Sequence, residues 1–185
     1  IHFRNNGMIL KYFKDSDIVV VEHQKFEDDR GFFFERQKNN FFLDHSPIFI
    51  QENHAFSKRD VLRGLHYQTK NPQGKFVSVV SGEILDVCVD LRKSSINFGK
   101  HFSFRLSSDN NKSIYVPPGY AHGYQVVSDT AYVIYSVTDI YNPKYEKTLL
   151  WNDSKLNIKW VESSKILVSE KDKLGDSFED SNYFD

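Results

Sequence analysis

The chain has little cysteine, since Cys88 is its only one, and this excludes an intramolecular disulfide and a zinc site made of several cysteines. It also lacks an excess of charge, because 24 Lys and Arg stand against 25 Asp and Glu. Without a large field of one sign, no nucleic acid and no membrane surface is expected as a partner. The chain has neither an apolar run near the ~20 residues that cross a bilayer nor an opening signal-peptide pattern. We therefore expect a soluble, cytoplasmic protein.

Methionine is equally scarce. Met8 is the only one, and it follows the residues IHFRNNG, so we expect residues 1–7 to be non-native and the natural chain to start at Met8. A chain of 185 residues with 39% hydrophobic content suffices for one buried core and is short for two. We predict a single domain over residues 8–172, followed by an acidic, polar surface tail at residues 173–185.

Aromatic residues, by contrast, are abundant, and 16 Phe and 10 Tyr favour β-structure. Short apolar or alternating runs separated by turn residues predict many strands, and helical periodicity is weak. The predicted strands cover residues 18–21, 32–34, 47–54, 76–80, 83–91, 101–106, 113–116, 125–127 and 131–141. This pattern predicts an all-β jelly-roll barrel. We expect a short helical turn at Asn39–His45 and a short helix near Asn152–Asn157.

The clearest alternation runs from Glu83 to Leu91, where apolar residues occupy one face and Asp86, Cys88 and Asp90 the other. A strand face with two carboxylates is either exposed to water or lines a polar cavity.

The stretch VLRGLHYQTKNPQGK places Arg63, His66 and Lys75 within fifteen residues of mostly strand-like chain. Arginine and lysine hold phosphate groups or a developing oxyanion. Histidine is the side chain best suited to move a proton near neutral pH. We interpret this stretch as the floor of an active site.

Three further clusters carry candidate chemistry. In VPPGYAHGY, a loop restricted by prolines and glycines is expected to present His122, although a plain turn with an exposed histidine fits equally well. In AYVIYSVTDIY, Tyr135 and Tyr141 would share one strand face and point into a cavity. In SEKD, Asp172 is a carboxylate able to orient His66, although a solvated surface charge is the simpler interpretation of these residues alone.

A metal site is not expected. Jelly-roll barrels often bind metals through a His-x-His pair with further ligands, but the residue two positions after His66 is Gln68. Two isolated histidines, His66 and His122, do not make a set of metal ligands. We therefore predict a site without metal.

These motifs together resemble the dTDP-4-dehydrorhamnose 3,5-epimerase family of the cupin superfamily. The resemblance extends from about Val19 to Asp172 through DDRGFFFE, QENHAFS, VLRGLHYQ, QGKFVSVVSGEILDVCVDLR, PPGYAHGY, YSVTDIY, LLWND and SEKD, in the same order. It implies a cupin jelly roll and a homodimer that inverts C3 and C5 of a nucleotide-linked 4-keto-6-deoxyhexose without a cofactor.

The resemblance also implies roles for individual residues. His66 would be the base, Tyr135 the acid on the opposite face, Asp172 the partner of His66, and Lys75 the group that stabilises the enolate oxygen. Arg63 would share that work or bind phosphate, His122 would touch the sugar, and Tyr141 would lie near its second face. The nucleotide contacts carried over from the family are Arg30, Glu35, Gln51, Asn53, Glu146 and Lys171, and Phe33 would stack on the base. Arg30 and Glu35 would serve the neighbouring subunit's site.

One departure bears on the substrate. The run YSVTDIY has Ser136 and Ile140 where the commoner form of the motif has a lysine or similar residue and a tyrosine. The wall facing the sugar is therefore expected to differ. An epimerase acting at C3 only or C5 only, or on a GDP- or CDP-linked 4-keto hexose or heptose, stays open. So do a cupin that only binds a nucleotide sugar, a sugar 3,4-ketoisomerase and, last, a metal-dependent oxygenase or isomerase.

Overall fold

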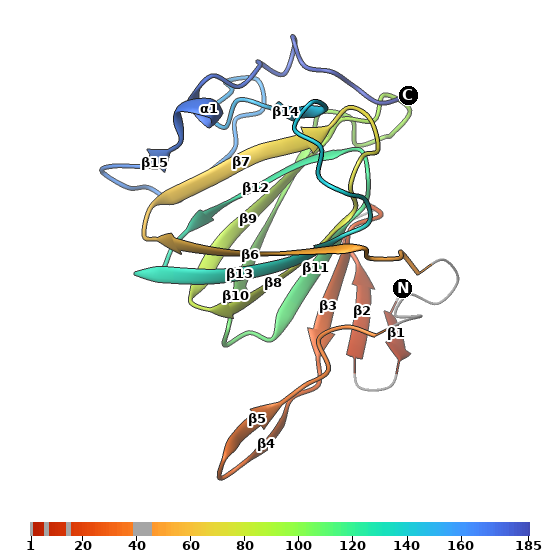
Figure 1. The fold of residues 1–185 in the computed structure, drawn as a ribbon, viewed down its shortest axis with the longest axis vertical. Helices are drawn as coiled ribbons and strands as arrows, with labels where there is room; N and C mark the ends of the chain where they lie inside the picture. The colour runs from red at the N-terminus through yellow and green to blue at the C-terminus, as the bar shows by residue number, and fades with distance from the viewer. Residues whose placement is uncertain (1, 6–7, 14–15, 39–45) are drawn as a thin grey trace.

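The strands of the computed structural model form two large sheets that face each other, and a separate hairpin (Figure 1). The structure describes residues 2–5, 8–13, 16–38 and 46–185. In spatial order, the first sheet contains β1 (His2–Asn5), β2 (Met8–Tyr12), β3 (Val19–His23), β11 (Lys112–Val116), β8 (Lys75–Ser81), β13 (Thr130–Val137) and β6 (Gln51–Lys58). The second contains β10 (His101–Ser107), β9 (Glu83–Asp90), β12 (Tyr120–Val126), β7 (Val61–Gln68) and β14 (Glu146–Thr148).

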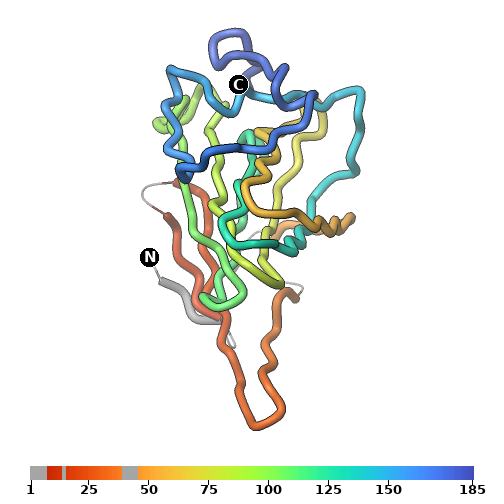
Figure 2. Tube along the Cα trace, turned by 90° about the vertical axis from the view of Figure 1, so that its left-hand side faces the viewer, coloured from red at the N-terminus to blue at the C-terminus, as the bar shows by residue number. Residues whose placement is uncertain are grey.

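Neighbouring strands within the two sheets are antiparallel, except that β15 (Leu167–Val168) pairs with β7 in parallel. The hairpin consists of β4 (Phe26–Asp28) and β5 (Gly31–Phe33), and it projects away from both sheets (Figures 1 and 2). These sheets confirm the all-β jelly-roll prediction. The helical turn expected at residues 39–45 lies outside the described residues.

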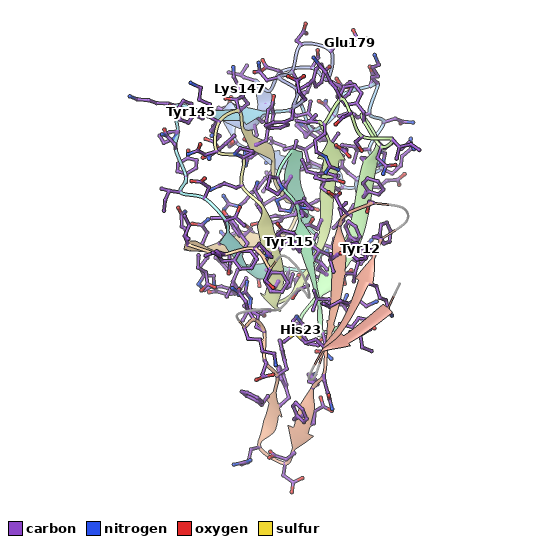
Figure 3. All side chains as sticks on the ribbon, turned by 90° about the vertical axis from the view of Figure 1, so that its right-hand side faces the viewer. Tyr12, His23, Tyr115, Tyr145, Lys147 and Glu179 are labelled. Atoms are coloured by element: carbon purple, nitrogen blue, oxygen red, sulfur yellow. The ribbon has the colours of Figure 1, made fainter. Side chains whose placement is uncertain are left out.

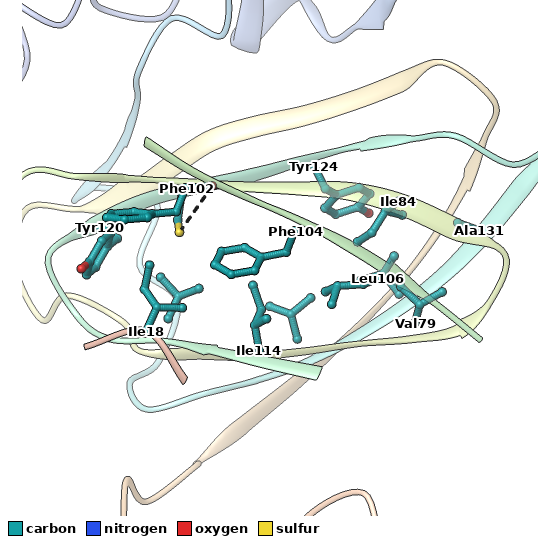
Figure 4. Packing of buried hydrophobic residues seen from close by; sticks show 14 of the residues in the cluster. Ile18, Val79, Ile84, Phe102, Phe104, Leu106, Ile114, Tyr120, Tyr124 and Ala131 are labelled. Carbon is teal, nitrogen blue, oxygen red and sulfur yellow. Dashed lines mark hydrogen bonds between the residues drawn. The ribbon is translucent and has the colours of Figure 1, made fainter. Parts of the chain in front are cut away.

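The main core fills the space between the two sheets (Figure 4). Alternate residues of the facing strands supply it, as the period of two along a strand requires. Its members include Ile84 from β9, Phe104 from β10, Ile114 from β11 and Val133 from β13. This core keeps the two sheets apart at a fixed distance, so groups on facing strands can be held across a common cleft.

The C-terminal residues are not a surface tail, and that prediction was wrong. Phe178 is buried in a second apolar cluster with Leu85, Val87 and Leu149, and Tyr183 and Phe184 pack against the same cluster. A backbone bridge joins Phe184 to Arg92, and another joins Asp176 to Leu149. Acidic residues dominate the composition of this segment, but its aromatic side chains cover the outer face of the second sheet. The folded domain therefore continues past residue 172.

The C-terminal segment also explains why β9 is buried. Its apolar face packs under the C-terminal segment and its other face points toward the space between the sheets. Asp86 and Asp90 are both fully buried, so neither is exposed to water. Asp86 accepts hydrogen bonds from His122, and Asp90 accepts them from Arg92. Each carboxylate thus has a charged or polar partner, as burial demands.

The helix predicted near Asn152–Asn157 is absent, because these described residues form turns. Helical structure occurs instead at α1 (Glu170–Lys173), a single turn whose N-cap is Ser169. The Ser169 side chain accepts a hydrogen bond from the backbone N–H of Asp172 at 3.1 Å, which is ordinary N-capping. Among the described residues, no helix is both long and apolar enough to cross a membrane.

Candidate active site

A cleft of about 670 Å³ opens between the two sheets, with β6, β8 and β13 on one side and β7, β12 and β14 on the other. This volume suits a small-molecule ligand. The cleft brings together most of the candidate residues predicted from the sequence: Gln51, Asn53, Arg63, His66, Lys75, His122, Tyr135, Tyr141 and Glu146.

His66, which lines the cleft, forms a short hydrogen bond with Asp172. His66 lies on β7, and its Nε2 donates to Asp172 Oδ1 at 2.6 Å. The other Asp172 oxygen, Oδ2, accepts from the backbone N–H of Gly64 at 3.2 Å. Burial raises the pKa of Asp172, but its hydrogen bonds to His66 and Gly64 outweigh that effect and lower the pKa below its usual value. Because Nε2 is the donor to Asp172, Nδ1 is the nitrogen able to accept a proton in the cleft.

Lys75 connects the two sheets at the floor of the cleft. It begins β8, its side chain is buried, and its Nζ donates to the backbone carbonyl of His66 at 3.1 Å. Burial lowers the pKa of Lys75 to about 8, although the carboxylates of Asp86 and Glu146 partly offset the effect. The ammonium is therefore present at neutral pH but is lost only slightly above it.

Tyr135 and Arg63 approach the cleft from opposite sheets. Tyr135 lies on β13 and is partly buried against the main core, and burial raises its pKa, so its hydroxyl keeps its proton at neutral pH. Arg63 lies on β7, and its Nε donates to Ser57 Oγ of β6 at 2.9 Å. Its guanidinium is held in place but exposed, which leaves donors for an anionic ligand.

His122 does not lie in a loop, so that expectation was wrong. The turn ends at Gly119, and β12 starts at Tyr120, so His122 is the third residue of a strand. Alternation along β12 points it toward the cleft, where its Nε2 donates to both oxygens of Asp86, at 2.8 and 3.0 Å. The sequence analysis missed this role of Asp86, and its only signal was the pair of acids on one face of the predicted strand.

The mouth of the cleft carries a group of polar contacts. Tyr141 donates its hydroxyl to Glu146 Oε2 at 2.6 Å, and Lys171 forms an ion pair with the same carboxylate. The hydrogen bond to Glu146 raises the pKa of Tyr141 to about 12. Gln51 donates to Asn53 at 2.8 Å and accepts from the backbone N–H of Tyr141 at 3.0 Å. Tyr141 follows the end of β13 at Val137, so the predicted shared strand face with Tyr135 was wrong.

Three predicted site residues lie away from this cleft. Arg30 is in the turn of the hairpin and pairs with Asp28 at 2.5 Å, Phe33 is 65% exposed on β5, and Glu35 pairs with Lys38. None of them lines the described cleft. Within one chain, the hairpin extends away from the strands that form the cleft (Figure 2).

The departures in YSVTDIY do not reshape the wall of the cleft, contrary to expectation. Ser136 lies on the opposite face of β13 from Tyr135, where its hydroxyl contacts Arg36, Gln37 and Glu52. Ile140 is 55% exposed, and neither residue lines the described cleft.

Among the described residues, no three His, Cys, Asp or Glu side chains gather in a way that would hold a metal ion. His66 and His122 each donate to a carboxylate of their own. What the cleft does bring together is an imidazole on one sheet, a phenol on the facing sheet, and a buried ammonium that donates to the backbone carbonyl of His66. Such a set can remove a proton beside a carbonyl, stabilise the enolate, and return a proton from the other face.

Comparison with known proteins gives a consistent result. Residues 14–180 match the family model described as dTDP-4-dehydrorhamnose 3,5-epimerase. The dTDP-4-dehydrorhamnose 3,5-epimerase of Pseudomonas aeruginosa is 43% identical over 171 residues, which cover 91% of this chain and 94% of that protein. The crystal structure of a dTDP-6-deoxy-D-glucose-3,5-epimerase from Legionella pneumophila, in complex with dTDP-4-keto-L-rhamnose, superposes with a TM-score of 0.90. It is 35% identical, with 93% of each chain covered.

A more distant solved structure is also similar. It is a 3'-monoepimerase from Streptomyces bikiniensis in complex with dTDP-quinovose, with a TM-score of 0.83 and 28% identity. The match covers 88% of this chain and 84% of that one. The same fold thus occurs in proteins described as double and as single epimerases.

Proposed function

This chain belongs to the dTDP-4-dehydrorhamnose 3,5-epimerase family, and we propose that its cleft inverts C3 and C5 of a dTDP-linked 4-keto-6-deoxyhexose by means of His66 and Tyr135. It is an isomerase of the carbohydrate epimerase type. The observation that carries the assignment of roles is that His66 and Tyr135 stand on facing sheets and line one cleft. Inversion needs this arrangement, because the proton must leave from one face of the sugar and return to the other.

Each inversion follows one course. Nδ1 of His66 takes the hydrogen next to the ketone as a proton. The electrons of the broken C–H bond form a C=C bond to the carbonyl carbon, and the carbonyl oxygen takes up the negative charge of an enolate. Asp172 stabilises the imidazolium that forms, and the Lys75 ammonium stabilises the enolate oxygen. The Tyr135 hydroxyl then gives its proton to the same carbon from the opposite face, and the carbonyl reforms.

The remaining cleft residues hold the substrate. Arg63 is placed to bind the diphosphate or share the oxyanion, and the Asp86-bound His122 contacts the sugar. Gln51, Asn53, Tyr141, Glu146 and Lys171 form the polar mouth and contact the nucleotide side of the substrate. The dTDP carrier is proposed from the Legionella pneumophila complex with dTDP-4-keto-L-rhamnose.

The active form is proposed to be a homodimer. The hairpin exposes Phe26, Phe32 and Phe33, at 53, 57 and 65%, and apolar groups on a projecting hairpin are expected to be covered by another chain. In that assembly Arg30, Glu35 and Phe33 reach the partner's cleft. Light scattering should give twice the mass of one chain, and Arg30→Ala should raise KM more than it lowers kcat.

Proton NMR in deuterated buffer tests the function directly. With dTDP-, GDP- and CDP-linked 4-keto-6-deoxy sugars, the C3 and C5 signals should both disappear for the dTDP substrate. Loss of one signal would show a single-site epimerase. Binding without loss of either signal would make the protein a nucleotide-sugar binder and overturn the proposal.

Tyr135→Phe separates the two halves of the reaction. The variant keeps His66 and should still exchange hydrogen at C3 and C5 with retention, whereas completed inversion should fall by about 10²- to 10⁴-fold. Deuterium wash-in and product formation are followed in the same sample. If both fall equally, Tyr135 positions the sugar and is not the acid.

The pH profile should report Lys75. Burial lowers its pKa to about 8, so the ammonium is present below that pH and kcat should fall as pH rises through about 8. The Lys75→Arg variant keeps its positive charge above this pH, since arginine stays protonated. Its residual kcat should therefore not fall as the pH rises through about 8. If kcat of Lys75→Arg still falls near the same pH, the fall belongs to the titration of another group.

A further inference from the structure

Tyr141 lies in a loop at the mouth of the cleft, and hydrogen bonds determine its position. The loop covers residues 138–145, between the end of β13 in the first sheet and the start of β14 in the second. The Tyr141 side chain is 45% exposed, so packing alone does not hold it. Its hydroxyl donates to Glu146 Oε2 at 2.6 Å, and its backbone N–H donates to Gln51 Oε1 at 3.0 Å.

Gln68 binds the backbone on both sides of Tyr141. It is the last residue of β7, is only 3% exposed, and does not itself line the described cleft. Its Oε1 accepts from the backbone N–H of Asn142 at 2.7 Å. Its Nε2 donates to the backbone carbonyls of Asn71 at 2.9 Å and Ile140 at 3.4 Å. One side-chain amide thus holds the two residues that flank Tyr141.

The backbone and the phenol of Tyr141 are held from neighbouring positions. Gln68 on β7 is the register partner of Glu146 on β14, the residue that accepts from the Tyr141 hydroxyl. A buried amide is costly unless its polar atoms are hydrogen-bonded, and a methionine at this position would avoid that cost. The polar atoms of Gln68 therefore indicate a role in directing the loop rather than in filling the core.

The far end of the loop is held by the same end of β7. Thr69 follows Gln68 and donates its backbone N–H to the carbonyl of Tyr145 at 2.9 Å. Tyr145 lies close to Lys147 of β14 (Figure 3). The loop is thus anchored to the end of β7 at two points.

We propose that Gln68 is a positioning residue for Tyr141, a role that rests on the proposed function. It does not touch the substrate and takes no part in proton transfer. By binding the backbone at Ile140 and Asn142, it orders the loop before the nucleotide sugar arrives. The entropic cost of ordering the loop then falls on folding and not on binding. Gln68 therefore controls how tightly the nucleotide side of the substrate is bound, and not the rate of inversion.

Gln68→Glu is the test, because it keeps the size of the side chain and replaces the two N–H donors with an oxygen that repels the carbonyls of Asn71 and Ile140. KM for the dTDP-linked 4-keto-6-deoxyhexose and Kd for dTDP should each rise about tenfold, whereas kcat should stay within about threefold of wild type. Steady-state kinetics and calorimetric titration with dTDP measure these constants. If Gln68→Glu does not fold, Gln68→Met removes the same hydrogen bonds without adding charge and should show the same split.

Gln125→Glu is the matched control. Gln125 is fully buried and also holds a distant segment through its amide, accepting from the backbone N–H of Val161 at 2.8 Å and donating to its carbonyl at 3.0 Å. It does not line the described cleft. This variant should lower the melting temperature and leave KM and Kd unchanged. An equal rise of KM in Gln125→Glu would show a general effect of destabilisation and overturn the proposal.

Tyr141→Ala completes a double-variant cycle. If Gln68 acts through Tyr141, adding Gln68→Glu to Tyr141→Ala should raise KM no further. An additive rise would overturn the proposal, as would an unchanged KM in Gln68→Glu or a kcat that falls as much as kcat/KM. Failure of the proposed function is a separate result, because the wild-type protein would then show no exchange at one or both carbons, while the titration with dTDP would still report on Gln68.

Discussion

Replacing His66 with alanine is expected to slow hydrogen exchange at both C3 and C5 by about 10²- to 10⁴-fold, the usual contribution of a general base. The reason is geometric. Its Nδ1 is the free nitrogen of an imidazole whose Nε2 donates to Asp172 at 2.6 Å. If His66 is the base for both carbons, exchange should slow at C3 and at C5 alike. Exchange is measured by proton NMR in deuterated buffer with the dTDP-linked 4-keto-6-deoxyhexose.

His101→Ala serves as the control for losing an imidazole. His101 lies on β10, at the edge of the second sheet, and does not line the described cleft. This variant should exchange at the wild-type rate. Appreciable exchange at either carbon in His66→Ala, with the fold intact by circular dichroism, would remove His66 as the base for that carbon.

Replacing Lys75 with methionine is expected to have opposite effects on activity and stability. Removing one well-placed donor from an oxyanion costs about 3–4 kcal/mol, or about 10²- to 10³-fold in kcat. The buried ammonium, in contrast, is costly to desolvate, and burial lowers its pKa to about 8. Methionine fills a similar volume without charge, so the melting temperature should stay or rise.

Steady-state kinetics and thermal unfolding of Lys75→Met check these two effects. Lys70→Met is the control, because Lys70 is exposed and its ammonium lies over the Tyr145 ring rather than in the cleft. A fall of several degrees in the melting temperature of Lys75→Met would show that its bond to the His66 carbonyl is structural. In that case the loss of activity would not measure enolate stabilisation.

Sequence patterns predicted the layers of this fold because each strand carries its own period of two. The alternation from Glu83 to Leu91 marks β9 without reference to any other segment. The same pattern does not reveal what covers each face. Asp86 is buried because a residue distant in the sequence, His122, approaches it on the neighbouring strand. Such pairings depend on topology and are not encoded in local spacing.

The errors have the same origin. The prolines before Gly119 indicate a turn, but pairing with β9 and β7 extends β12 back to Tyr120 and places His122 in a strand. The acidic composition near the C-terminus concealed Phe178 and Phe184, whose packing appears only once the second sheet is formed. Asp172 was linked to His66 by resemblance alone, since 106 residues separate them in the sequence.

That separation has a consequence for how the protein matures. Apart from the short β15, the strands that form both sheets of the sandwich are complete at Thr148, whereas the carboxylate that pairs with His66 arrives with α1. During synthesis, a chain could close its barrel with the cleft walls in place while the dyad is still open. A protease that cuts before Ser169 would remove the Asp172 carboxylate together with Phe178 and Phe184, so the second sheet would lose its cover and His66 would lose its partner. One short C-terminal segment thus completes the catalytic pair and covers the second sheet, so trimming it is expected to cost both activity and stability.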